Sequence, residues 1–114
     1  MIRRIITYGD NFINFYKSQE FKIQEKIEYV LDLVRFEKQV PIKFFKYLDD
    51  TDGIYEIRIM TTFKNIQILC FFDKGELVVL TNCFIKKTQR TPRKEIRNTE
   101  KLKKEYLTEK YGGR

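Results

Sequence analysis

The central part of the chain constrains the fold most, because it consists of short apolar segments separated by tight-turn sequences. The segments GIYEIRIM (53–60), NIQILCFF (65–72) and ELVVLTNCF (76–84) are rich in the β-branched and aromatic residues that favour strands. Between them, DDTDG (49–53) and DKG (73–75) contain the Asp and Gly residues typical of chain reversals. Strands joined by tight turns pair antiparallel, so this pattern predicts an antiparallel sheet.

The flanking segments complete an α+β pattern. RRIITY (3–8) predicts a first strand, Asp10 is the expected N-cap of a short helix, and KFFKYL (43–48) predicts another strand. From Ser18, apolar residues at helical spacing predict a helix that ends before Pro41. The residues of this apolar stripe are Ile23, Ile27, Val30, Leu31 and Val34. We expect one domain over residues 1–114, with the order β-α-α-β-β-β-α and helices packed on a small antiparallel sheet.

The net positive charge is confined to the C-terminal quarter of the chain. Residues 1–85 contain twelve basic and twelve acidic side chains, whereas residues 86–114 contain eleven basic and four acidic ones. Thr91 as N-cap and Pro92 as first residue predict a basic helix over about 92–110. Its apolar positions are Ile96, Leu102, Tyr106 and Leu107. Such a segment suits binding to a polyanion; the alternatives are a helix that only aids solubility and, less readily, a membrane-surface helix.

Composition narrows the chemistry that is possible. The chain has no histidine, which removes Ser–His and Cys–His catalysis and the commonest metal ligand. Cys70 and Cys83 are expected opposite Val79 and Ile66 in a hairpin that turns at residues 74–75, too far apart for a disulfide, and therefore to be buried thiols. We expect neither a metal nor a cofactor. No signal peptide and no membrane-spanning run is visible, so we expect a cytoplasmic protein.

Polar residues in the predicted strands indicate a candidate site. Glu56 and Arg58 are two residues apart and so share one face of their strand, where they could simply form an exposed ion pair. In the next strand, Gln67 stands among apolar neighbours, and Lys86 and Lys87 end the last strand. If the strand registers allow it, these five side chains lie on one surface.

Such a surface suits cleavage of RNA by its own 2′-hydroxyl group. The reaction needs the hydroxyl to lose a proton, the leaving 5′-oxygen to gain one, and the charge on the phosphate to be stabilised. Arginine offers a planar cationic fork to a phosphate. A lysine crowded by other cations loses its proton more readily and can act as a base or an acid. Neither a metal ion nor a histidine is required.

Three segments of the chain resemble a known toxin family. GIYEIRI (53–59), FFDKGELVVLTNCF (71–84) and FIKKTQRTPRKEI (84–96) resemble the phage-associated HigB-like branch of the RelE/ParE superfamily. The pattern in that branch is an aromatic–Glu–Leu/Ile–Arg strand, a hairpin, and Phe-x-Lys-Lys-Thr-Gln-Lys-Thr-Pro before a helix. The resemblance covers about residues 43–107 and implies a RelE-like fold.

The resemblance also implies a function. It implies the toxin of a type II toxin–antitoxin system, a ribosome-dependent endoribonuclease that cuts mRNA and is neutralised by a cognate antitoxin, often of the helix-turn-helix type. Carried over by position, Arg58, Lys86 and Lys87 are catalytic, with Glu56 and Gln67 beside them. The expected RNA-binding residues are Arg90, Arg93, Lys94 and Arg97.

At one position the chain departs from the family pattern. Family members usually carry an arginine in the strand after the Glu-x-Arg segment, where this chain has Gln67. Glutamine can hydrogen-bond a phosphate but supplies no charge, and losing such a contact could lower the rate by about 10²–10³. Two alternatives therefore stay open: a non-catalytic module that binds RNA or protein and, less favoured by the KKTQRTP sequence, a gyrase inhibitor of the ParE type.

Overall fold

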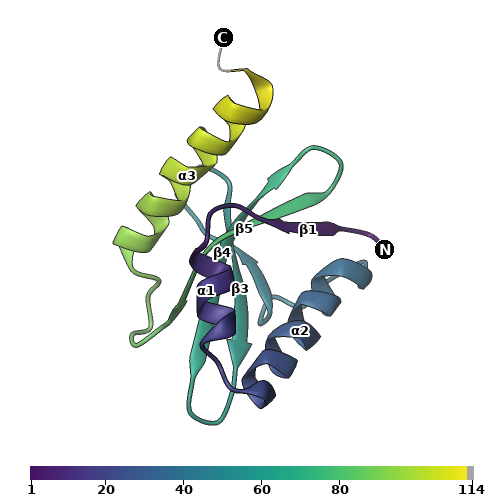
Figure 1. The fold of residues 1–114 in the computed structure, drawn as a ribbon, viewed down its shortest axis with the longest axis vertical. Helices are drawn as coiled ribbons and strands as arrows, with labels where there is room; N and C mark the ends of the chain where they lie inside the picture. Colours follow the sequence, from purple (N-terminus) through teal and green to yellow (C-terminus); the bar gives the residue numbers. More distant parts are fainter. Residues whose placement is uncertain (113–114) are drawn as a thin grey trace.

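The computed structural model describes residues 1–112 and has an α+β architecture (Figure 1). The elements in chain order are β1 (Arg4–Thr7), α1 (Asn11–Lys17), α2 (Phe21–Phe36), β2 (Phe45–Tyr47), β3 (Ile54–Met60), β4 (Asn65–Asp73), β5 (Leu77–Ile85) and α3 (Arg93–Tyr111). The α+β class is confirmed, and all four segments predicted as strands after α2 form strands, one more than the order β-α-α-β-β-β-α counts. No helix among residues 1–112 combines the length and the apolar character needed to cross a membrane.

The strands form one mixed sheet in the order β1-β5-β4-β3-β2. Strands β2 to β5 pair antiparallel with their neighbours, as the tight turns predicted. β1 is the exception, because it pairs parallel with β5, with Arg4 opposite Leu77 and Thr7 opposite Leu80. The prediction of a purely antiparallel sheet is therefore wrong for β1. Its partner lies far away in the sequence and is not joined to it by a hairpin, so no tight turn dictates the direction of pairing.

The β4–β5 hairpin has a longer loop and a less regular register than predicted. Asp73 pairs with Leu77, so residues 74–76 form a three-residue loop in place of the predicted two-residue turn. The register then shifts once more between Ile68 and Cys70. The alternation of apolar side chains along a strand predicts neither an extra residue in the loop nor an irregular strand register.

The two cysteines are buried free thiols, as expected. Cys70 lies opposite Leu80 and Cys83 opposite Ile68, which differ from the predicted partners by one and two residues. Burial raises the pKa of both thiols well above its ordinary value. These side chains therefore belong to the core rather than to a reactive site.

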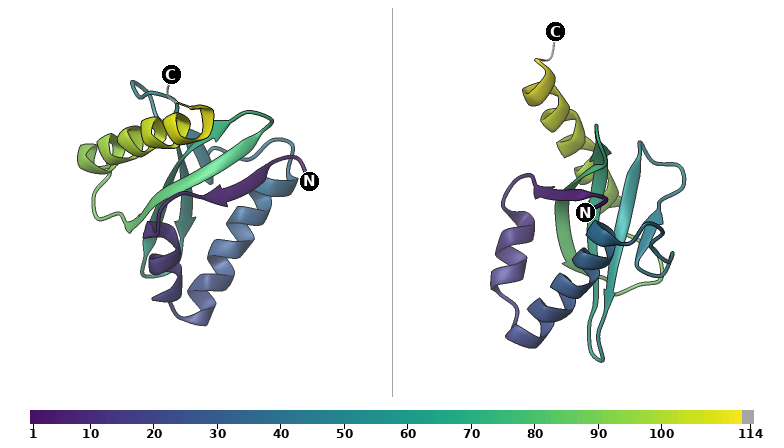
Figure 2. Two further views of the ribbon diagram at one scale, coloured as in Figure 1. Left: turned by 45° about the horizontal axis from the view of Figure 1, so that its top comes forward. Right: turned by 90° about the vertical axis from the view of Figure 1, so that its right-hand side faces the viewer.

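Helices cover both faces of the sheet (Figure 2). On one face, α1 and α2 enclose the larger core, and the predicted α2 stripe is confirmed, since Ile27, Val30, Leu31 and Val34 are buried and Ile23 packs against them. On the other face, α3 covers a smaller core. The buried members of this smaller core are Leu48, Ile54, Leu69, Phe71, Leu77, Val79 and Tyr106. The polar face of β3 lies on the α3 side of the sheet.

The start and end of α3 differ slightly from the prediction. Pro92 occupies the N-cap position and Arg93 is the first helical residue. The predicted N-cap role of Thr91 is wrong, because its hydroxyl donates to the side chain of Glu56 instead. The helix ends at Tyr111, and its C-cap is Gly112, whose φ of 88° is readily adopted by glycine.

A buried carboxylate fastens the C-terminal half of α3 to the hairpin. Asp73, whose side chain is 2% exposed, accepts hydrogen bonds of 2.7 Å from the hydroxyls of Tyr106 and Tyr111 and from the Lys110 ammonium group. Burial by itself would raise the pKa of Asp73, but the hydrogen bonds from Lys110, Tyr111 and Tyr106 outweigh it and hold the pKa well below its usual range.

Replacing Asp73 with Asn should lower the free energy of unfolding by roughly 1–3 kcal/mol at pH 7, because charge-assisted hydrogen bonds are lost. Since the folded-state pKa of Asp73 lies below the unfolded-state value, this stabilisation is complete above about pH 4 and is lost as the pH falls toward the folded-state pKa. Denaturant titration at several pH values would measure the difference between the two proteins. Asp32→Asn, at an exposed ion pair, is the control and should change stability by less than about 1 kcal/mol; an Asp73→Asn effect of the same size at pH 7 and pH 3 would contradict the prediction.

Candidate functional site

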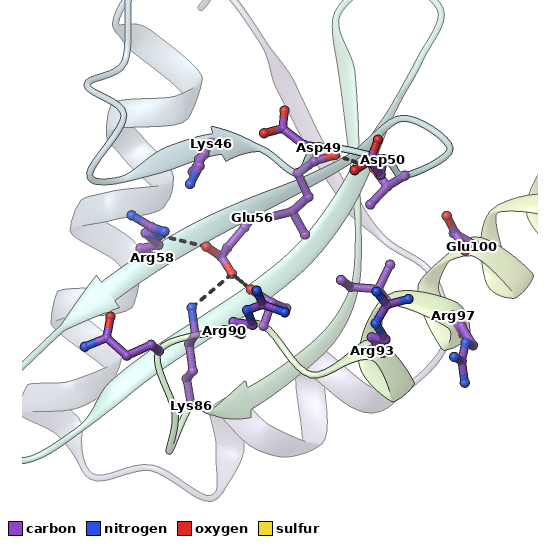
Figure 3. Close-up of a pocket in the computed structure, with 15 residues that line it drawn as sticks. Lys46, Asp49, Asp50, Glu56, Arg58, Lys86, Arg90, Arg93, Arg97 and Glu100 are labelled. Carbon is purple, nitrogen blue, oxygen red and sulfur yellow. Dashed lines mark hydrogen bonds and ion pairs between the residues drawn. The ribbon is translucent and has the colours of Figure 1, made fainter.

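A buried carboxylate lies at the centre of the polar face of the sheet. Glu56, in the middle of β3, has no exposed surface. Arg58 Nε donates to Glu56 Oε2 at 2.7 Å, and the Thr91 hydroxyl donates to Oε1. Lys86 Nζ forms an ion pair with Oε1 at 3.8 Å (Figure 3). Glu56 therefore contacts two cations, Arg58 and Lys86, and also Thr91 in the loop that precedes α3.

Gln67 completes the surroundings of Glu56 from β4. It lies opposite Arg58 in the strand register and is 1% exposed. A carboxylate only accepts hydrogen bonds, so the NH₂ group of Gln67 faces it, 2.8 Å from Oε1 and 3.2 Å from Oε2. The Gln67 oxygen then lies 2.9 Å from Asn65 Oδ1. Because two amide oxygens cannot hydrogen-bond to each other, the Asn65 amide takes the orientation that turns its NH₂ group toward Gln67. Gln67 is thus engaged with Glu56, which differs from the expected role as an uncharged phosphate contact.

The interpretation of Glu56 and Arg58 as an exposed ion pair is wrong. β3 alternates as predicted, but both faces of the sheet are covered. Glu56 is buried because Lys86 and the Thr91 loop close over it, and the Arg58 side chain remains 28% exposed. Arg58 therefore connects a buried anion to the surface.

A cavity of about 660 Å³ lies beside this cluster and is lined by Glu56, Arg58 and Lys86. Figure 3 shows residues of α3 facing the same space from the opposite side. Three of the four expected RNA-binding residues line it: Arg90, Arg93 and Arg97. Lys94 is exposed but is not among its lining residues. The basic segment is thereby divided into a part that faces the cavity and a part that does not.

A second cavity of about 520 Å³ shares Arg58, Lys86 and Gln89 with the first. Lys87 lines only this second cavity and is exposed. The Lys86 side chain lines both cavities and is only 6% exposed. The two lysines, expected to act as a pair, thus occupy different environments, and only Lys86 contacts Glu56.

Sequence reasoning missed two residues of the site. Lys46 lies directly opposite Glu56 in the β2–β3 register and lines the first cavity. The strand was predicted, but its register against β3 was not, and only the register places Lys46 on the Glu56 face. Thr91 was assigned to helix capping, and nothing in the sequence indicated that its hydroxyl reaches β3.

The chemistry of the site is that of cations and hydrogen-bond donors. Among residues 1–112, no three or more His, Cys, Asp and Glu side chains gather in an arrangement that could hold a metal ion. The first cavity is lined by six cations, those of Lys46, Arg58 and Lys86 and of the three arginines of the following loop and helix. Four carboxylates, those of Asp49, Asp50, Glu56 and Glu100, line it too, so cations outnumber carboxylates by two. Such a set of side chains suits an anionic ligand that offers several acceptor oxygens.

Comparison with known proteins places the chain in a family. The sequence pattern of the family described as "Phage derived protein Gp49-like (DUF891)" matches residues 14–104. The chain belongs to this family. The matched Gp49-like region begins within α1 and ends within α3, so it contains all residues of the site described above. No match was found among curated proteins.

The fold is similar to one chain of a solved complex, the archaeal RelE–RelB complex from Pyrococcus horikoshii OT3. The TM-score is 0.56 at 15% sequence identity, and the alignment covers 75% of this Gp49-like chain and 96% of the other. At this identity the similarity concerns the fold alone, and it confirms the expected RelE-like architecture.

Replacing Glu56 with Gln keeps the shape of the side chain but removes the charge that Arg58 and Lys86 face. We expect the free energy of unfolding to fall by roughly 1–3 kcal/mol, because charge-assisted hydrogen bonds are lost. Chemical denaturation would measure this difference. Glu25→Gln, at an exposed position on α2, is the control and should change stability by no more than about 0.5 kcal/mol. Equal stabilities of Glu56→Gln and the wild type would show that Glu56 does not organise the site.

Proposed function

We propose that this protein is the toxin of a type II toxin–antitoxin system, in the HigB-like branch of the RelE/ParE superfamily, and that it cuts mRNA on the ribosome in the cytoplasm. The observation that carries the proposal is the convergence of Arg58 and Lys86 on the buried Glu56, beside a cavity lined by arginines. Membership of the Gp49-like family, the RelE-like fold and the KKTQRTP sequence at 86–92 support it.

Arg58 would hold the phosphate that is cleaved. Among the described residues, the hydrogen bond from Arg58 to Glu56 uses Nε, which leaves the two terminal nitrogens of the guanidinium group for a ligand in the cavity that Arg58 lines. Those nitrogens can bind two phosphate oxygens together. They would stabilise the charge that develops as the 2′-oxygen bonds to phosphorus.

Lys86, held by the same carboxylate, would exchange protons with the reacting oxygens. The 2′-hydroxyl loses its proton and its oxygen bonds to phosphorus. The bond between phosphorus and the 5′-oxygen breaks, and that oxygen takes up a proton. The products are a 2′,3′-cyclic phosphate and a 5′-hydroxyl end. Lys46, opposite Glu56, is a second amine that lines the cavity.

A cognate antitoxin would be expected to cover the same cavity. The similar archaeal structure is a complex of RelE with RelB. In this chain, Arg90, Arg93 and Arg97 offer a basic surface to an acidic segment of such a partner, as in an antitoxin of the helix-turn-helix type. Binding there would exclude RNA from Arg58.

One observation favours a second candidate, a module that binds RNA without cutting it. Both carboxylate oxygens of Glu56 are engaged, by Arg58, Gln67, Thr91 and Lys86, so this carboxylate is not available as a general base. Gln67 also stands where family members are expected to have an arginine. In this second case the cations bind the phosphate backbone and no bond breaks.

Expression of the wild-type protein should arrest growth and produce mRNA fragments that depend on ribosomes. Arg58→Ala and Lys86→Ala should each lower the cleavage rate by about 10²–10³, because a donor to the transition state is lost. Mapping of RNA 5′ ends together with growth curves would measure this. Lys22→Ala removes a positive charge from an exposed position on α2, outside both cavities, and should leave the arrest intact. Arg58-dependent RNA binding without growth arrest would favour the non-catalytic candidate, and no effect of Arg58→Ala on either property would contradict both.

The arginines of the first cavity should set the salt dependence of RNA binding. Single-stranded RNA releases counterions on binding, and each lost phosphate contact lowers the slope of log K against log salt concentration by about 0.7. We expect the double variant Arg93→Ala, Arg97→Ala to lower this slope by about 1.4 in fluorescence anisotropy titrations. Lys101→Ala, Lys104→Ala removes two charges from exposed positions of the same helix and serves as the control. Equal slopes for the two double variants would contradict the assignment.

A further inference from the structure

We propose that Asp49 and Asp50 form an acidic wall of the first cavity, and that this wall weakens the binding of free RNA. The proposal rests on the function proposed above, in which Arg58 and Lys86 hold a phosphate at this cavity. RNA that the ribosome presents is already at the site and can be bound despite a low affinity, whereas free RNA is held too weakly. The two aspartates are therefore specificity-determining residues and take no part in bond cleavage.

The first cavity is far from uniformly positive. Six cations and four carboxylates line it, and one of these carboxylates, Glu56, is already engaged by Arg58 and Lys86. The second cavity differs, because within residues 1–112 its lining contains three cations and no carboxylate. Of the two cavities, the first therefore carries the carboxylates that would oppose a bound phosphate.

The charges of Asp49 and Asp50 are available to act on a ligand. Both residues lie in the loop between β2 and β3, and both are exposed. Figure 3 shows them at one end of the cavity, with Lys86 at the other end. In the part of the chain that the structure describes, neither carboxylate forms an ion pair. Their negative charge is therefore not neutralised by a neighbouring cation.

The loop that carries the acidic wall is held by its own hydrogen bonds. The Thr51 hydroxyl donates to the backbone oxygen of Leu48 at 2.7 Å and accepts from the backbone nitrogen of Ile54 at 3.1 Å. Asp50 has a φ of 59°, a conformation that aspartate and asparagine adopt more readily than most other residues with side chains. The two carboxylates thus belong to a defined turn.

Contacts with α3 fix the same loop at the cavity. The backbone nitrogen of Asp52 donates to Glu100 Oε2 at 2.9 Å, and the backbone oxygen of Asp52 accepts from Lys103 Nζ at 2.7 Å. A Cβ atom at Gly53 would lie only 2.8 Å from Lys103 Nζ, so the loop and the helix approach closely. The acidic wall is therefore tied to the helix whose arginines line the cavity.

The size of the cavity makes the repulsion effective. A volume of about 660 Å³ corresponds to a width on the order of 10 Å, close to the Debye length at physiological ionic strength. A phosphate held by Arg58 and Lys86 would therefore lie within the range at which Asp49 and Asp50 repel it. Because the cations attract the same phosphate, the acidic wall lowers the affinity without preventing binding.

Fluorescence anisotropy with a short, labelled oligouridylate tests the acidic wall. At about 0.1 M salt, Asp49→Asn, Asp50→Asn should bind this RNA roughly 5-fold to 50-fold more tightly than the wild type, since two repelling charges are removed. The gain should shrink as the salt concentration is raised, because ions screen the repulsion. Glu25→Gln, Glu28→Gln removes two charges from exposed positions of α2 outside both cavities, and this matched control should change the affinity by less than about 2-fold.

A third variant and Arg58→Ala separate the possible failures. Asp49→Lys, Asp50→Asn reverses one charge and should raise the affinity further, a graded gain that a loss of folding would not produce. A gain no larger than that of the control in both aspartate variants would overturn the acidic wall. If RNA binding is then still lost in Arg58→Ala, the proposed function stands. RNA binding by none of these proteins would overturn the acidic wall together with the proposed RNA recognition.

Discussion

Glu56 is a carboxylate without exposed surface, and burying such a charge costs several kcal/mol unless it is paired and hydrogen-bonded. Here the compensation comes from separate parts of the chain. Arg58 is on the same strand, Gln67 on the next, and Lys86 and Thr91 lie beyond β5. Because the carboxylate requires all of them, its burial fixes the loop before α3 against the sheet and orients the cations that face both cavities.

A second buried carboxylate controls the other end of α3. Asp73 fastens the C-terminal half of the helix to the β4–β5 hairpin. Nearer its start, the amide nitrogen of Asn82 donates to Glu95 at 2.9 Å, and the Thr81 and Thr99 hydroxyls lie 2.9 Å apart in the core. The helix is thus held to the sheet along its length, and this placement turns the arginines of its first turns toward the cavity.

Periodicity in the sequence was sufficient where a pattern is local. The stripe of α2, the strands around the two central turns and the extent of α3 were predicted to within a few residues, because burial on one face repeats at the period of each element. The parallel pairing of β1 with β5 and the irregular register of the hairpin were not predicted. Both depend on pairing between segments, which alternation within one segment does not encode.

For the candidate site, too, some features follow from the sequence and others only from the tertiary structure. The sequence by itself determined which chemistry is present: no histidine, Glu56 and Arg58 on one strand face, and a basic segment that begins at Lys86. Only the tertiary structure decided that Glu56 is buried, that Lys46 and Thr91 join it, and that Lys86 and Lys87 separate. The physical reason is that a charge enters the interior only where partners converge on it, and strand register and loop path determine that convergence.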